Sequence, residues 1–134
     1  MAGELILVVE DNEKNLKLVR DLLQVKGYRT LEAGTAELGV ELARHHIPHL
    51  ILMDIQLPGM DGVAALGQLR GDPSTAKIPV IALTAFAMRD DHQRFCAVGF
   101  DGYLVKPINI RELLEVIRAC CDQRGERSTL GDPA

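Results

Sequence analysis

LILMDIQLPGMDG, residues 50–62, is the stretch that decides the fold. It begins with four apolar residues, continues with Asp54, and then passes into a segment that contains Pro58, Gly59 and Gly62. A short continuous apolar run followed by turn residues is typical of a strand buried on both faces of a parallel sheet. Ligands bind such sheets at the carboxyl ends of the strands, and Asp54 stands at that end of this run.

The same pattern of an apolar run followed by a polar residue occurs three more times. LILVV precedes Glu10 and Asp11, PVIAL precedes Thr84, and YLV precedes Lys106. Because parallel strands end at the same edge of a sheet, we expect these side chains to converge with Asp54. The sequence therefore predicts one site with three carboxylates, a hydroxyl and an amine.

Helical patterns separate the apolar runs. In the second of these helices, at 35–45, we expect Leu38, Leu42 and Ala43 to face inward. Five strands alternating with five helices indicate an α/β domain, with a parallel sheet covered by helices on both faces. The predicted strands are 5–9, 28–31, 50–53, 79–83 and 103–105, and the predicted helices are 12–26, 35–45, 63–69, 88–98 and one that Asn109 caps.

Composition limits the classes of function. The 134 residues carry a net charge of −4 without a basic stripe, which does not favour direct binding of nucleic acid. The sequence shows neither an apolar run of membrane-spanning length nor a charged and apolar leader, so we expect a cytoplasmic protein. We expect one domain over residues 1–122 and a flexible C-terminal tail over 123–134.

The predicted site favours chemistry on phosphate. Glu10, Asp11 and Asp54 would place three negative charges together, and a hard divalent cation such as Mg²⁺ relieves that repulsion. Lys106 and Thr84 can contact a phosphoryl oxygen as an ammonium and a hydroxyl donor. An Asp beside Mg²⁺ and an ammonium is well placed to attack phosphorus and form an aspartyl phosphate.

Each of these residues also has a simpler explanation. Asp54 alone could cap a loop, whereas Glu10 and Asp11 could cap the first helix, a role compatible with metal binding. Thr84 could be a turn hydroxyl, and Lys106 could be a solvated loop lysine. The agreement of all four strand ends favours a functional site.

Four motifs together resemble the receiver domain of bacterial two-component response regulators. They are VVEDN at 8–12, LILMDIQLPGMDG at 50–62, IALTAFA at 81–87 and YLVKPI at 103–108, and the resemblance covers residues 4–121. It implies a flavodoxin-like (CheY-like) three-layer sandwich with strand order 2-1-3-4-5 and five helices. The loops MDIQLPG and TAFAM further resemble single-domain regulators of cell polarity and division, the DivK type.

The resemblance implies a role for each site residue. Asp54 would accept a phosphoryl group from the phosphohistidine of a sensor histidine kinase or a histidine phosphotransferase. Glu10, Asp11, Asp54 and the backbone carbonyl of Gln56 would bind Mg²⁺, with Glu10 in direct contact or through water. Lys106 would pair with a phosphoryl oxygen, and its bond to the following proline is a candidate cis peptide.

The resemblance also implies a switch rather than a turnover enzyme. Thr84 would move toward the phosphate and Tyr103 would follow it inward. This movement would repack the surface of the fourth helix, fifth strand and fifth helix, which would contact a downstream protein target. We expect a monomer or weak dimer that contacts neither nucleic acid nor membrane.

There are three alternatives. A degenerate receiver that serves only as a docking scaffold is disfavoured, because no site residue is missing. The chain could be a receiver module from a larger hybrid kinase or multidomain regulator. It could instead be a phosphatase that uses Asp54 as a nucleophile on a small molecule, although no second Asp stands two residues after Asp54 to act as a general acid.

The resemblance further assigns the lifetime of the phosphorylated state to Gln56 and Phe86, which would border the path of an attacking water. Phe86 cannot orient a water, so we expect the phosphoryl group to be lost more slowly than from receivers with an acid at this position.

Phe86→Glu should speed this loss, which phosphate release after removal of the donor would measure. An unchanged or slower rate would count against the assignment.

Overall fold

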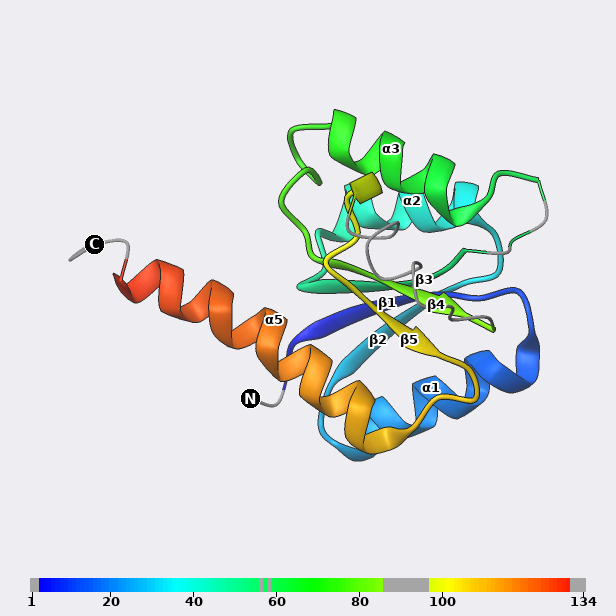
Figure 1. The fold of residues 1–134 in the computed structure, drawn as a ribbon, viewed down its shortest axis with the longest axis horizontal. Coiled ribbons are helices and arrows are strands. Elements are labelled where there is room, and N and C mark those ends of the chain that lie inside the picture. The colour runs from blue at the N-terminus through cyan, green and yellow to red at the C-terminus, as the bar shows by residue number, and fades with distance from the viewer. Residues whose placement is uncertain (1–2, 56, 58, 86–96, 131–134) are drawn as a thin grey trace.

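The computed structural model describes residues 3–55, 57, 59–85 and 97–130 (Figure 1). Within them, strands and helices alternate along the chain from residue 5 to residue 84, as the apolar runs predict. The strands are β1 (Leu5–Val9), β2 (Arg29–Ala33), β3 (Leu50–Asp54), β4 (Val80–Thr84) and β5 (Gly102–Val105). The helices with both ends among the described residues are α1 (Glu13–Val25), α2 (Ala36–His46), α3 (Gly62–Gly71) and α5 (Ile110–Leu130).

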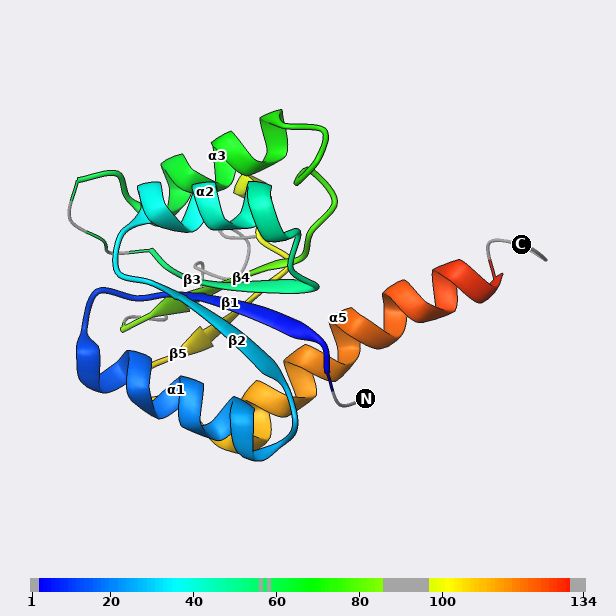
Figure 2. The same ribbon diagram turned by 180° about the vertical axis from the view of Figure 1, so that it is seen from behind.

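The strands form one parallel sheet in the order β2-β1-β3-β4-β5, which confirms the predicted order. The helices α2 and α3 cover one face of the sheet, and α1 and α5 cover the other (Figures 1 and 2). The fold is therefore the predicted three-layer sandwich. The predicted helix 88–98 lies outside the described residues except for Ala97 and Val98, which are helical.

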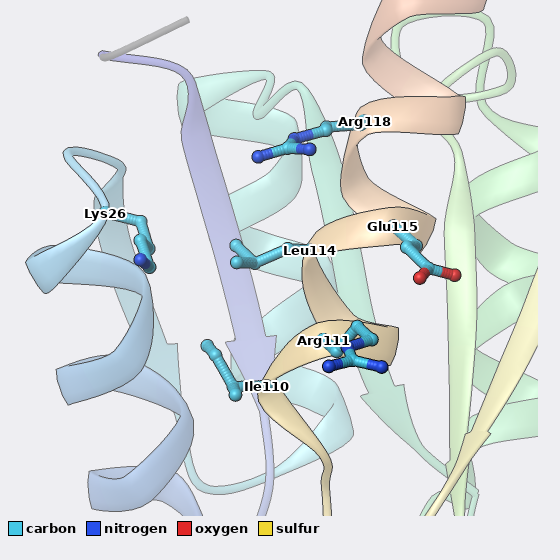
Figure 3. A pocket seen from close by; sticks show the side chains of 6 residues that line it. All are labelled: Lys26, Ile110, Arg111, Leu114, Glu115 and Arg118. Atoms are coloured by element: carbon cyan, nitrogen blue, oxygen red, sulfur yellow. The ribbon is translucent and has the colours of Figure 1, made fainter.

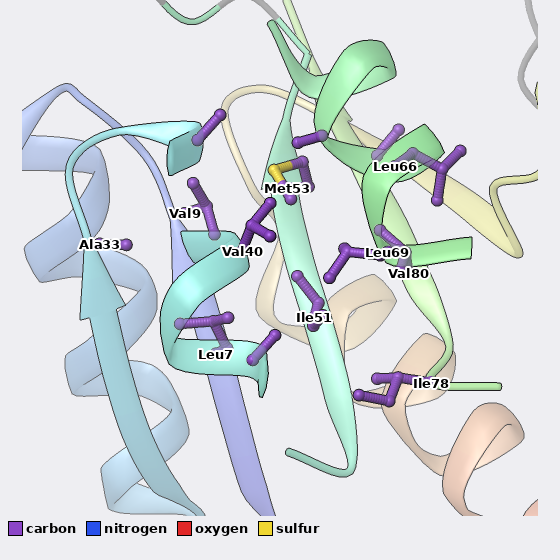
Figure 4. Close-up of a cluster of buried hydrophobic side chains, with 14 of the residues drawn as sticks. Leu7, Val9, Ala33, Val40, Ile51, Met53, Leu66, Leu69, Ile78 and Val80 are labelled. Carbon is purple, nitrogen blue, oxygen red and sulfur yellow. The ribbon is translucent and has the colours of Figure 1, made fainter. Parts of the chain in front are cut away.

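Each face of the sheet carries its own hydrophobic core. Leu7 and Ile51 lie in the core beneath α2 and α3 (Figure 4), whereas their neighbours Ile6 and Leu52 lie in the core beneath α1 and α5. Successive residues of a strand point to opposite faces, so a strand between two cores must be apolar throughout. This requirement explains the continuous apolar runs of the central strands.

The edge strand β2 departs from its predicted bounds. The alternating pattern predicts a strand at 28–31, but the structure places it at Arg29–Ala33. Only Ala33 of this strand is buried, because β2 has a neighbour on one side alone. A half-exposed edge strand leaves a weaker apolar signal than a central one, which accounts for the shifted bounds.

The inward face of α2 was predicted only in part. Ala43 is buried and Leu42 is partly buried, but Leu38 is 43% exposed. The buried face of α2 instead consists of small residues and one valine. A Cβ on Gly39 would lie 2.7 Å from a methyl carbon of Val9, so α2 packs against β1 at a distance that leucine does not allow. The members of this face are Ala36, Gly39, Val40 and Ala43.

Side-chain caps begin α2 and α5, and the cap of α5 is one that the sequence predicts. The Thr35 hydroxyl accepts from the Leu38 N–H at 3.1 Å, and the Asn109 side chain accepts from the N–H groups of Arg111 and Glu112. Each cap pairs an N–H group that the first helical turn leaves without an intrahelical partner.

The last helix is long. α5 runs to Leu130, so its helical backbone extends past residue 123, where the sequence predicts the start of a C-terminal tail. The flexibility of residues 123–134 stays a prediction. Among the described helices, none combines the length and apolarity that crossing a membrane requires.

Gly62 allows α3 to begin directly against the end of β3. A Cβ on Gly62 would lie 2.6 Å from the backbone oxygen of Asp54 and 2.8 Å from the Cα of Ile55. These are backbone atoms, which cannot rotate aside as a flexible side chain can. Gly67 lies on the exposed face of the same helix, and a Cβ there would meet nothing within 4 Å.

These two glycines should therefore respond in opposite directions to alanine. Gly62→Ala should lower the free energy of unfolding by about 1–3 kcal/mol, because the end of β3 must shift. Gly67→Ala should raise it by about 0.5–1 kcal/mol through helix propensity alone. Urea denaturation measures both values. Equal effects of the two substitutions would contradict the close approach at Gly62.

Candidate functional site

The polar residues at the strand ends meet at one edge of the sheet. Glu10 follows β1, Asp54 ends β3, Thr84 ends β4 and Lys106 follows β5. These four strands are adjacent and parallel, so their carboxyl ends open at the same edge. Glu10, Asp54 and Thr84 are buried, Lys106 is partly buried and Asp11 is exposed. The structure thus brings together the strand-end residues that the sequence predicts.

The Lys106 ammonium lies between two carboxylates. Its Nζ is 2.7 Å from Oε1 of Glu10 and 2.7 Å from Oδ2 of Asp54. The side chains of Glu10 and Asp54 are 1% and 4% exposed, and that of Lys106 is 18% exposed. Two buried negative charges therefore share one positive charge, which leaves the buried part of the site with an excess of negative charge.

For both Glu10 and Lys106, burial shifts the pKa in one direction and the charged partner shifts it in the other. Burial raises the pKa of the Glu10 carboxyl, and the Lys106 hydrogen bond only partly offsets that effect. For Lys106, burial alone lowers the pKa, but the hydrogen bonds and charges of Asp54 and Glu10 outweigh burial and raise it. Lys106 therefore stays an ammonium at neutral pH, and the raised pKa lets the Glu10 carboxyl take up a proton more readily than usual.

Three carboxylates form a candidate cation site. Ligand oxygens of Glu10, Asp11 and Asp54 all lie within 4.8 Å of one another. Carboxylate oxygens are the ligands that Mg²⁺ prefers, and exposed Asp11 leaves one side of the cluster open to water. The donor set fits a hard divalent cation that keeps part of its hydration shell.

The backbone places Lys106 and Thr84 next to each other. The Lys106 N–H donates to the Thr84 carbonyl at 2.7 Å, which continues the β4–β5 ladder past the end of β5. The predicted cis peptide between Lys106 and Pro107 is confirmed. Tyr103 is partly buried and packs against the core beneath α2 and α3, in register with Ala82 of β4. The switch role of Thr84 and Tyr103 stays a prediction.

Two predicted residues lie outside the described part of the chain. They are Gln56 and Phe86. The sequence resemblance predicts that the Gln56 backbone carbonyl binds Mg²⁺ and that both residues set the lifetime of the phosphorylated state. Sequence reasoning in turn missed a role for Asn12. Its backbone N–H donates to Oε2 of Glu10 at 3.1 Å, and its side chain caps α1. A side-chain oxygen just before an amphipathic helix is the signal that could have identified this cap.

Sequence comparison finds one family model and close relatives. Residues 6–118 match the model of the response regulator receiver domain. Over 114 residues the chain is 44% identical to the polar-differentiation response regulator DivK of Brucella ovis, covering 85% of this chain and 93% of that protein. This match confirms the resemblance to the DivK type.

Solved receiver domains have the same fold. The receiver domain of the sensor histidine kinase PA1611 from Pseudomonas aeruginosa has a TM-score of 0.83 at 33% identity, covering 90% of this chain and 99% of that one. That structure has a magnesium ion coordinated in its active site cleft. The chemotaxis protein CheY4 of Vibrio cholerae has a TM-score of 0.82 at 27% identity, covering 89% of this chain and 99% of that one.

The Lys106 ammonium should stabilise the folded protein. In magnesium-free buffer at pH 7, Lys106→Met should lower the free energy of unfolding by about 2–3 kcal/mol, because two buried carboxylates lose their cation. The partial exposure of Lys106 keeps this cost below that of a fully buried pair. Lys77→Met, at an exposed position away from the site, should have little effect.

The pH dependence of that deficit has a definite sign. The folded state holds a proton on Glu10 at higher pH than the unfolded state does, so acidification from pH 7 toward 4.5 favours folding. The Lys106 hydrogen bond lowers the pKa of Glu10, so loss of Lys106 should extend the pH range in which Glu10 is protonated in the folded state. The loss of unfolding free energy in Lys106→Met should therefore shrink as the pH falls. Urea unfolding at pH 7 and pH 5 in EDTA measures it; a deficit that is absent, or that grows at pH 5, would contradict the shared-ammonium arrangement.

Proposed function

The chain belongs to the response regulator receiver domain family of two-component signalling, and from this premise we propose that Asp54 is its phosphoacceptor. The donor is the phosphohistidine of a sensor histidine kinase or a histidine phosphotransferase. The observation that carries the proposal is the position of Asp54, a buried carboxylate at the edge of the sheet, within an acidic cluster and 2.7 Å from an ammonium.

The transfer exchanges one bond to phosphorus for another. A carboxylate oxygen of Asp54 attacks the phosphorus, the phosphorus–nitrogen bond breaks, and the electron pair remains on the imidazole nitrogen of the donor. The product is an aspartyl phosphate. Positioning and charge stabilisation are the protein's main tasks in such a transfer.

We propose Mg²⁺ as the cofactor, held by Glu10, Asp11 and Asp54, with the backbone carbonyl of Gln56 as a further ligand. Support comes from the three clustered carboxylates and from the magnesium ion in the Pseudomonas aeruginosa receiver domain. The bound ion would neutralise charge on the phosphoryl oxygens. Glu10 and Asp11 would hold the ion from the end of β1.

Lys106 and Thr84 complete the proposed site. The Lys106 ammonium, which now bridges Glu10 and Asp54, would bind an oxygen of the transferred phosphoryl group. The Thr84 hydroxyl would donate to another oxygen, and Tyr103 would adjust its packing as Thr84 moves. The local change in charge thereby alters the packing of β5, a mechanism shared by other phosphorylation switches.

The output is proposed to be protein binding rather than catalytic turnover. Val98 and Val105 are 47% and 39% exposed, and Val105 belongs to β5, which also carries Tyr103. An exposed apolar side chain on the strand that carries a switch residue suits contact with a downstream protein. We also propose a cytoplasmic protein that acts as a monomer or weak dimer.

Phosphoryl labelling tests the assignment. With acetyl phosphate and Mg²⁺, wild-type protein should gain one phosphoryl group, measured by intact-protein mass spectrometry, and EDTA should prevent the gain. Asp54→Asn should abolish labelling because the nucleophilic oxygen is lost. Asp61→Asn is the matched control, because asparagine preserves its cap on α3.

Two results would contradict the proposal. Labelling of Asp54→Asn at the wild-type level would remove Asp54 from the acceptor role. Sustained hydrolysis of a chromogenic phosphomonoester, lost in Asp54→Asn, would instead assign the site to a small-molecule phosphatase.

A further inference from the structure

A second candidate binding surface lies between the end of α1 and the first turns of α5. Its cavity has a volume of about 460 Å³. In Figure 3 the side chains of Ile110, Leu114 and Arg118 point from α5 toward the end of α1 that carries Lys26. We call this surface the α1–α5 groove. Its lining residues are Lys26, Ile110, Arg111, Leu114, Glu115 and Arg118.

The α1–α5 groove has an apolar floor and a cationic rim. Ile110 and Leu114 are only partly buried although both pack against the core beneath α1 and α5. Lys26, Arg111 and Arg118 are exposed, and no carboxylate among the described side chains forms an ion pair with any of them. In a chain of net charge −4, three cations against one Glu115 make this surface complementary to an acidic partner.

The spacing of the rim favours an elongated occupant. Arg111 and Arg118 are seven residues apart on α5, so they lie about 10 Å apart along the helix axis. Acidic residues two turns apart on a second helix have the same spacing, and an apolar residue between them falls opposite Leu114, which lies between Arg111 and Arg118 on α5. A helix in an apolar groove with charged edges is a recurrent mode of peptide recognition.

The Lys26 end of the groove is remote from the start of α1, beside which Asp11 stands. Asp11 stands before the first residue of α1 and Lys26 stands after the last, and a helix of 13 residues is about 20 Å long. An occupant of the groove therefore need not cover the phosphoryl site.

We propose that the α1–α5 groove binds an acidic amphipathic helix of a partner protein. The apolar face of that helix lies on Ile110 and Leu114, and its carboxylates pair with Lys26, Arg111 and Arg118. The proposal does not depend on phosphorylation of Asp54, because none of these residues belongs to the phosphoryl site.

The test uses a synthetic three-heptad amphipathic peptide with leucine at the apolar positions and glutamate beside them. Fluorescence anisotropy with the full chain should show saturable binding that weakens as salt rises. Arg111→Glu combined with Arg118→Glu should weaken binding by about tenfold or more. Lys77→Glu with Arg44→Glu makes the same change in net charge away from the groove and should change the affinity by less than about twofold.

Three outcomes would overturn the proposal. One is an absence of binding, and another is equal affinity for a peptide with lysine in place of glutamate. The third is self-association of the wild type that Arg111→Glu with Arg118→Glu abolishes, which would make the groove an interface between two copies. Labelling of the double variant by acetyl phosphate is a separate readout and should remain at the wild-type level, so failure of one proposal leaves the other testable.

Discussion

One ammonium between two buried carboxylates is the interaction on which the site depends. Glu10 and Asp54 are almost fully buried, and Lys106 contacts both at 2.7 Å. Removal of charge from water costs several kcal/mol per ion unless a partner compensates, and here two anions share one cation. The imbalance makes the site receptive to a further cation, and it keeps Lys106 near the atom that we propose as the acceptor.

The rest of the fold holds these three groups in place. β1, β3, β4 and β5 run parallel, so their last residues meet at one edge, and the two cores fix the central strands from both faces. Gly62 lets α3 start against the backbone of Asp54, and the Lys106 N–H extends the β4–β5 ladder. The charged groups thus lie on or directly after the ends of rigid strands, as a preorganised site requires.

Much of this arrangement follows from the sequence, because a buried parallel strand needs an apolar run and the polar residue after it marks the sheet edge. That logic located Glu10, Asp54, Thr84 and Lys106. It failed for Leu38, because small residues rather than leucines let α2 approach β1. It could not predict that Lys106 bridges both acids, because that contact depends on how the chain leaves β5, and periodicity does not report the path of a loop.

The most direct test of the central claim is to map the phosphorylated residue. Protein treated with acetyl phosphate and Mg²⁺ is reduced with borohydride, which converts an aspartyl phosphate to homoserine, and the digested peptides are sequenced by mass spectrometry. The account predicts homoserine at position 54 alone. Homoserine at position 11 or elsewhere, with residue 54 unchanged, would contradict it.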